Sequence, residues 1–369
     1  MLEVEYVPAV LPPTPKEQHP HDDWVSAVTA LGPNGAVVSG CYDGVVRLWS
    51  GAAASSSSGK SSSSFTAHKG AVKAAVTAGS SEGQLLLTAG ADCSARVWRG
   101  VAVGSVTGPG RPELAAVLKG HTDSVEAAAA SPDGSLCLTG GWDGRLLLWR
   151  CGDSLLAAAE GGADAEGGEQ QANGRAAAAK KRRVGANGLA VAPHEEAPRQ
   201  ELSAHTQCVA GVAWPTEATA VTASWDHSVR LWDVEAGANT DSLHHNKAIY
   251  CVAAAASSSL LAFGGAERAL RVWDPRARGG EALAMRACTS HTGWVSALAW
   301  HPTSQHHIVS ASHDGTAKLW DLRASVPLHT LGGGGSDGTK LLCVAWVAGG
   351  SAVATGGTDC QLRVAEVSL

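Results

Sequence analysis

The sequence lacks several features that would place it in a common class of protein. Its 369 residues contain no apolar run long enough to span a membrane, no helical heptads and no CxxC pair among the nine cysteines. The first residues lack the basic stretch and long apolar core of a secretory signal. We therefore expect a soluble, intracellular protein. Its cysteines, most of them inside apolar strand patterns, favour buried reduced thiols over disulfides or metal ligands.

Charge is also scarce in this chain. Charged residues make up 17% of it, and the net charge of −6 argues against nucleic acid as the main partner of the folded part. Hydrophobic residues make up 44%, which is enough for a sizeable core. The 44 glycines suit a protein with many tight turns.

The chain contains an internal repeat. Residues 222–233 indicate a strand end, a tight turn at Asp226 and a second strand that ends on Trp232 and Asp233. The spacing of an acidic residue and a tryptophan six positions later recurs as Asp43/Trp49, Asp92/Trp98, Asp143/Trp149, Asp226/Trp232, Glu267/Trp273 and Asp314/Trp320. A seventh copy has Asp359, with Ala365 at the tryptophan position.

These repeats predict an all-β fold. Each contains three apolar strands, and a fourth precedes the start of the next repeat, so seven repeats of about 40 residues indicate a seven-bladed β-propeller over residues 21–369. The last repeat stops after its third strand. We therefore expect the N-terminal segment, residues 1–20, to supply the outer strand of the last blade before its proline-rich linker.

One long interruption separates the third and fourth repeats. Residues from about 151 to 198 are rich in alanine, glycine and glutamate and show no apolar periodicity, which predicts a disordered insertion. A basic cluster lies within it, formed by Lys180, Lys181, Arg182 and Arg183. Such a cluster has three interpretations: a nuclear import signal, an RNA phosphate contact or a solvated loop.

A histidine, a hydroxyl residue, an aspartate and a tryptophan recur together. The complete sets are His21/Ser39/Asp43/Trp49, His68/Thr88/Asp92/Trp98, His121/Thr139/Asp143/Trp149, His205/Thr222/Asp226/Trp232 and His291/Ser310/Asp314/Trp320. A hydrolytic triad is needed once, whereas this set occurs five times, so we expect a structural hydrogen-bond network. The fifth repeat has Asn246, Phe263 and Glu267 at these positions, and the seventh has Asp337 and Ala365. No catalytic residue, cofactor or metal site is predicted.

Six further side chains occupy two recurring positions. Each either immediately precedes a turn aspartate or follows a repeat histidine by three residues; they are Trp24, Tyr42, Trp142, Trp225, Trp294 and His313. In a propeller both positions lie on one face near the central channel. We expect a partner-binding face there, and the alternative is that these side chains pack the channel.

The repeats resemble the WD-repeat (WD40) family. Residues 231–233, 272–274 and 319–321 each end in the Trp-Asp dipeptide that marks it. This resemblance implies a propeller that is, as a rule, a non-catalytic scaffold. Trp273–Arg276 and Trp320–Arg323 also resemble the WDxR signature of substrate receptors for cullin-based ubiquitin ligases, an alternative function. The two arginines would otherwise simply cap the ends of strands.

A narrower resemblance is to the WD-repeat subunits of the PeBoW complex. It rests on residues 21–25, 224–235, 272–276 and 289–295 and on the charged insertion. It implies a factor of the nucleolus and nucleoplasm that assembles the large (60S) ribosomal subunit and is required to process pre-rRNA. It also implies direct binding to the block-of-proliferation protein, and through it to pescadillo, on the pre-60S particle. With that role, the basic cluster is interpreted as a nuclear import signal.

Members of this family also carry an N-terminal ubiquitin-like domain that docks onto the AAA ATPase midasin. Residues 2–7 resemble only the last strand of such a domain. We therefore expect the sequence to be a fragment, or else the midasin contact to be lost, and we assign that contact to no residue. The sequence likewise assigns no residue to direct contact with pre-rRNA.

Overall fold

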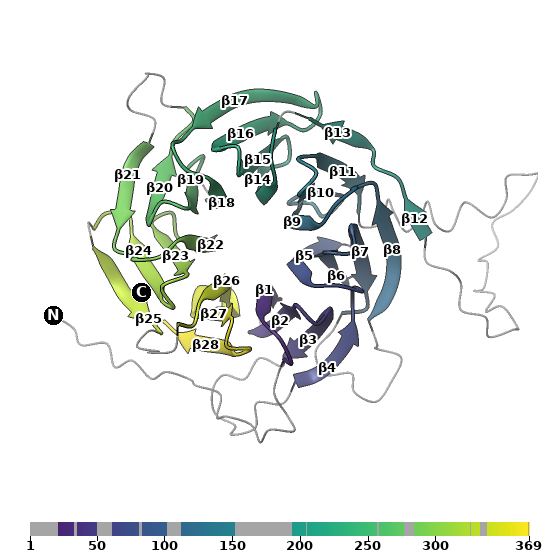
Figure 1. The fold of residues 1–369 in the computed structure, drawn as a ribbon, viewed down its shortest axis with the longest axis horizontal. Helices are drawn as coiled ribbons and strands as arrows, with labels where there is room; N and C mark the ends of the chain where they lie inside the picture. The colour runs from purple at the N-terminus through teal and green to yellow at the C-terminus, as the bar shows by residue number, and fades with distance from the viewer. Residues whose placement is uncertain are drawn as a thin grey trace, which may run out of the picture.

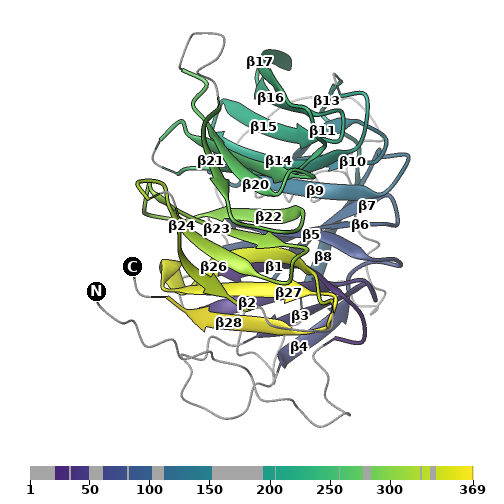
Figure 2. The same ribbon diagram turned by 60° about the vertical axis from the view of Figure 1, so that its left-hand side comes forward.

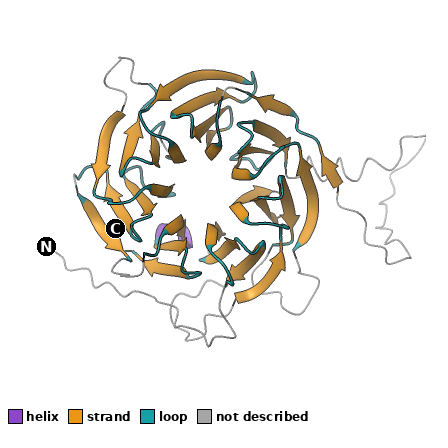
Figure 3. Ribbon diagram, viewed as in Figure 1, coloured by secondary structure: helices purple, strands orange, loops and turns teal. Residues whose placement is uncertain are grey.

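Seven β-sheets form a closed ring around a central axis (Figures 1 and 3), as the repeats predict. The computed structural model describes residues 21–32, 35–49, 61–80, 83–101, 112–151, 194–203, 205–256, 258–276, 284–324, 326–332, 338–367 and 369. The described residues contain one short 3₁₀ helix, η2 (Ala348–Gly350), and none of their helices has the length and hydropathy that spanning a bilayer requires.

The first three blades contain strands β1 to β13, and one of them, β12, joins its blade out of chain order. Blade 1 consists of β1 (Val25–Leu31), β2 (Ala36–Cys41), β3 (Val45–Trp49) and β4 (Ser61–Thr66). Blade 2 consists of β5 (Val72–Ser80), β6 (Gly83–Gly90), β7 (Ser94–Arg99), β8 (Glu113–Lys119) and β12 (His194–Glu196). Blade 3 consists of β9 (Val125–Ala130), β10 (Leu136–Gly141), β11 (Leu146–Arg150) and β13 (Gln200–Leu202).

The remaining blades follow the chain in order. Blade 4 consists of β14 (Val209–Thr216), β15 (Thr219–Ser224), β16 (Ser228–Asp233) and β17 (Ala238–His244). Blade 5 consists of β18 (Ile249–Ala254), β19 (Leu261–Gly265), β20 (Ala269–Trp273) and β21 (Ala284–Thr289). Blade 6 consists of β22 (Val295–Trp300), β23 (His307–Ser312), β24 (Ala317–Asp321) and β25 (Pro327–Leu331). Blade 7 consists of β26 (Leu341–Val347), β27 (Ala352–Gly357) and β28 (Leu362–Glu366).

Adjacent blades pack through a small residue of one and a branched residue of the next, so that the sheets stand face to face (Figure 2). A Cβ added to Gly140 would lie 2.5 Å from a methyl carbon of Val209, the first residue of the next blade. Gly356 of blade 7 has the same relation, at 2.5 Å, to Val25 of blade 1. The joint that closes the ring is therefore built like the joints within it.

The predicted insertion is ordered at both ends. Cys151 is buried, and its N–H donates to the Ser135 carbonyl at 2.7 Å. Strand β12 pairs in parallel with β8 at the rim of blade 2, where Lys119 Nζ lies 2.5 Å from Glu195 Oε1 (Figure 1). It covers the otherwise open edge of β8. The prediction of disorder is thus wrong for residue 151 and for residues 194–198, and the rest of the insertion lies outside the described residues.

The last blade has three strands among the described residues, and none of these pairs with the outer edge of β28. The N-terminal segment is predicted to fill that place. Residues 1–20 lie outside the described residues, so the closing strand stays a prediction.

Candidate functional site

The recurring tetrads link strands within a blade. In blade 2, His68 Nδ1 lies 2.8 Å from Asp92 Oδ1, and His68 Nε2 lies 2.9 Å from Thr88 Oγ1. The Trp98 indole donates to the same hydroxyl at 3.0 Å. Because a carboxylate only accepts, His68 carries its proton on Nδ1 and the hydroxyl donates to Nε2. Each polar group is therefore engaged by another member of the set.

The same contacts recur around the ring. They connect the four side chains within each tetrad of three further blades: His121, Thr139, Asp143 and Trp149 in blade 3; His205, Thr222, Asp226 and Trp232 in blade 4; and His291, Ser310, Asp314 and Trp320 in blade 6. The histidine precedes the innermost strand, the hydroxyl lies on the second and the tryptophan on the third. The tetrads thus hold the loops of one face in equivalent places.

Blade 1 has a different arrangement. His21 Nε2 and the Trp49 indole each lie 2.7 Å from Ser39 Oγ. Arg47 Nη1, however, lies 2.6 Å from His21 Nδ1 and 3.4 Å from Asp43 Oδ2. Because a guanidinium only donates, His21 accepts on Nδ1 and carries its proton on Nε2, the opposite tautomer. Burial, together with the charge of Arg47, lowers the pKa of His21 to about 3.

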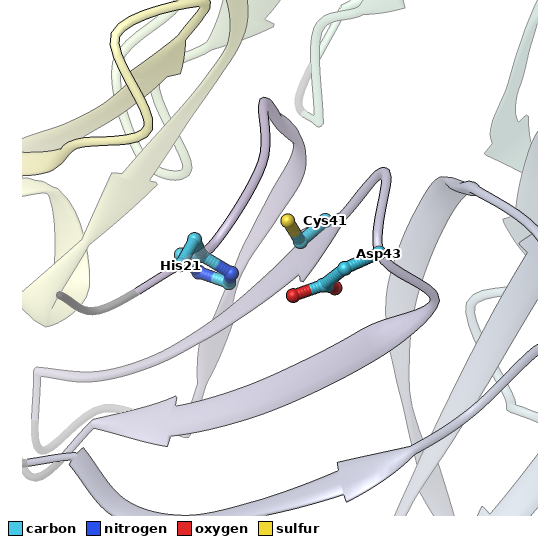
Figure 4. A group of neighbouring side chains, drawn as sticks. All are labelled: His21, Cys41 and Asp43. Carbon is cyan, nitrogen blue, oxygen red and sulfur yellow. The ribbon is translucent and has the colours of Figure 1, made fainter.

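His21, Cys41 and Asp43 also form the group of side chains that most resembles a metal site in the described residues (Figure 4). Their candidate ligand atoms lie within 4.8 Å of one another. Burial raises the pKa of the Cys41 thiol to about 12, and this thiol donates to the Asp23 carbonyl at 3.2 Å. An ion would have to deprotonate the thiol and displace the Arg47 guanidinium from His21. We therefore assign no metal to this cluster.

Blade 5 differs from the prediction at its histidine position. The histidine position belongs to His245, not to Asn246: His245 Nε2 lies 3.0 Å from Glu267 Oε2. Phe263 replaces the hydroxyl residue, and the buried Trp273 indole has no hydrogen-bond partner. In blade 7, Ala365 takes the tryptophan position on β28, and Asp337 lies outside the described residues.

The arginines of the two WDxR pairs bond within their own strand ends. Arg276 Nε lies 3.2 Å from Asp274 Oδ1, and Arg323 Nη2 lies 2.7 Å from Asp321 Oδ2. Both guanidinium groups remain mostly exposed. This pairing accounts for both arginines without a partner protein.

The six predicted aromatic and histidine residues lie on one face of the ring, around the mouth of the central channel. Trp24, Trp142 and Trp294 are 44%, 43% and 49% exposed. Their rings pack against neighbours: Trp24 on Tyr42 at a centroid distance of 5.4 Å, Trp142 edge-on to Trp225 at 4.6 Å, and Trp294 on His313 at 5.8 Å. We call these six residues, with Tyr250, the channel-mouth face.

Tyr250 was not predicted to belong to this face. Its ring bridges Trp225 at 5.6 Å and Trp294 at 5.8 Å, so it connects blades 4, 5 and 6. It follows His245 by five residues, the same offset that separates Lys73 from His68 and Glu126 from His121. That offset is the sequence signal for channel-facing residues, and the one-residue error in blade 5 concealed it.

A hollow of about 270 Å³ opens at the channel mouth. Aromatic rings line it from blades 1, 3, 4, 5 and 6: Tyr42, Trp142, Trp225, Tyr250 and Trp294. Lys73 and Glu126 complete the wall between blades 1 and 3. The arrangement offers apolar contact area around a small polar centre, which is typical of a protein-recognition surface.

Comparison with known proteins identifies the class of this ring. The sequence matches the WD domain, G-beta repeat family at residues 14–50, 59–99, 112–150, 196–233, 238–274 and 284–321. The chain is therefore a WD40-repeat β-propeller. The matches stop before blade 7, whose tetrad lacks its tryptophan.

Curated relatives resemble the chain over nearly its whole length. A ribosome biogenesis protein WDR12 homolog of Chlamydomonas reinhardtii is 44% identical over 99% of this chain and 81% of its own length. Homologs of the same name from rice (Oryza sativa subsp. japonica) and Arabidopsis thaliana are 37% and 36% identical, again over 99% of this chain and each over 78% of its own length. The chain belongs to the WDR12 family and has a role in ribosome biogenesis.

The contribution of the tetrad hydrogen bonds can be isolated with two matched tryptophans. Trp232→Phe and Trp273→Phe remove the same atoms from sites that are each 1% exposed, but only the Trp232 indole has a hydrogen-bond partner. We expect Trp232→Phe to lower the free energy of unfolding by about 1–2 kcal/mol more than Trp273→Phe. Urea titration of the full chain measures this difference. Equal losses would show that the network adds no stability.

Stability should fall as the pH falls, in two stages. Burial lowers the pKa of His21 and His121 from the ordinary 6.5, so below that pH the unfolded chain binds protons that the folded chain does not. Burial acts to raise the pKa of Asp92 and Asp226, but hydrogen bonds from their histidines and serines hold it below the ordinary 3.8. Their contribution is therefore present above about pH 4 and lost below it.

We therefore expect the urea midpoint to decrease between about pH 7 and pH 5 and to decrease further below about pH 4. Tryptophan fluorescence across a pH series provides the measurement. A midpoint that stays constant or rises on acidification would contradict the assignment of these histidines as neutral in the folded state.

Proposed function

We propose that this protein is a non-catalytic scaffold in assembly of the large (60S) ribosomal subunit, needed for processing of pre-rRNA to the mature large-subunit RNAs. Two findings support this. The relatives are ribosome biogenesis proteins, and the histidine, hydroxyl and carboxylate groups of the complete tetrads are engaged with one another or with Arg47. The observation that carries the proposal is the channel-mouth face, with three half-exposed tryptophans.

The partner proposed for this face is the block-of-proliferation protein, which would link the chain to pescadillo and the pre-60S particle as in a PeBoW complex. Tryptophan and tyrosine contribute much of the binding energy at protein interfaces. Trp24, Trp142 and Trp294 are too exposed to be explained as packing of the channel alone. A midasin contact is not assigned to any residue.

The proposed location is the nucleus, in the nucleolus and nucleoplasm. The basic cluster of the insertion, residues 180–183, is the proposed import signal; it lies outside the described residues.

Truncation of the face should weaken binding without unfolding the propeller. We expect Trp142→Ala and Trp225→Ala each to raise the Kd for purified block-of-proliferation protein by at least about tenfold. Leu328→Ala, which removes a 41% exposed side chain from the outer rim, serves as the control. Calorimetric titration gives the Kd, and urea unfolding tests the fold. Unchanged affinity would contradict the face assignment, as would unfolding of both tryptophan variants.

Nuclear accumulation of the fluorescently tagged chain should fall when alanine replaces all four residues of the basic cluster: Lys180, Lys181, Arg182 and Arg183. Loss of the four charges removes the groups that an import receptor binds. Alanine substitution of Arg268 and Arg276, two basic residues that lie outside any cluster, provides the control. Normal accumulation of the first variant would argue against the import signal.

A further inference from the structure

The channel-mouth face should be interrupted at blade 2. The residue before the turn aspartate is Tyr42 in blade 1 and Trp142 in blade 3, but Ala91 in blade 2. Alanine has no ring to contact either neighbour. The structure nevertheless contains a continuous chain of contacts across this gap, made by Lys73 of β5 and Glu126 of β9.

Lys73 and Glu126 contact each other and both flanking rings. Lys73 Nζ lies 3.5 Å from Glu126 Oε1, donates to the Tyr42 hydroxyl oxygen at 3.2 Å and lies 4.8 Å from the centroid of that ring. Glu126 Oε1 accepts from the Trp142 indole at 2.9 Å and from the Ser124 hydroxyl at 2.7 Å. One oxygen atom thus gathers three donors from two blades.

The burial of this pair distinguishes it from an ordinary surface ion pair. Its side chains are 19% and 18% exposed, whereas those of Lys119 and Glu195 at the outer rim are 58% and 62% exposed. Burial acts to lower the pKa of Lys73, but Glu126 and Tyr42 raise it above its ordinary value, so the ammonium stays charged. Charge-assisted hydrogen bonds in such a site hold their groups in a defined geometry.

We propose that Lys73 and Glu126 are positioning residues of the channel-mouth face, which fix the rings of Tyr42 and Trp142 in the orientation that a protein partner meets. The inference rests on the proposed function for its binding consequence, but the orientation itself is a property of the free chain. Fixing these rings before association removes part of the entropy cost of binding. The pair also completes a continuous series of side-chain contacts around the channel-mouth face, from Trp24 in blade 1 to His313 in blade 6.

The spectroscopic test needs no partner. In the full chain labelled with ¹⁵N, the indole N–H resonance of Trp142, assigned by its loss in Trp142→Ala, reports the bond to Glu126. We expect Glu126→Ala to shift or broaden it, and Glu126→Gln, which keeps an acceptor oxygen, to restore most of its position. Lys119→Met and Glu195→Ala remove the same charges at the rim and should leave it unchanged. A resonance unmoved in Glu126→Ala would overturn the proposal.

The binding test uses purified block-of-proliferation protein. We expect Lys73→Met and Glu126→Ala each to raise the Kd about tenfold. The Kd of Glu126→Gln should be intermediate, and those of the rim variants should stay within about twofold of the wild-type value. If Trp142→Ala weakens binding but Lys73→Met and Glu126→Ala do not, the positioning role is wrong and the face stands. If Trp142→Ala also binds normally, the proposed function of the face is wrong. If Glu126→Ala unfolds, the Kd values of Lys73→Met and Glu126→Gln are compared with that of Trp142→Ala instead.

Discussion

The second strands of the blades are buried on both of their sides, and the rest of the structure depends on that constraint. Strands β2 and β27 are buried at all six of their positions, so no blade can satisfy its faces without two neighbours. A ring meets this requirement with one kind of joint, seen where Val209 packs against Gly140 and where Val25 packs against Gly356. The first and last blades therefore share a cluster that includes Trp49 and Val347.

The channel-mouth face is a product of that ring. Each tetrad ties the loop before the innermost strand to the turn between the second and third strands, so both chain positions come to the same side of the sheet. Trp142 and Trp225 are 83 residues apart in number (225 minus 142) yet meet edge to edge. The surface is thus assembled from single side chains contributed by separate blades, and its rings are held by the same architecture that holds the propeller.

Repetition made the fold predictable from the sequence. The spacing of aspartate and tryptophan indicates seven blades, and the positions of Trp24 and Trp294 relative to their histidines indicate one face. Three features escape this reasoning. Strand β12 is three residues long and pairs with a strand 78 positions earlier in the chain, His194 with Ala116. The register of blade 5 is obscured by adjacent histidine and asparagine, and the Lys73–Glu126 contact joins two different blades.

The path of the chain through β12 has a mechanical consequence. The chain leaves blade 3 at Cys151, pairs through β12 with blade 2, and only then returns to blade 3 through β13 (Figure 1). Any pull exerted through residues 152–193 is therefore divided between two sheets, with one end anchored in each. A load that would peel a single outer strand from an ordinary blade here meets resistance from a neighbouring blade as well.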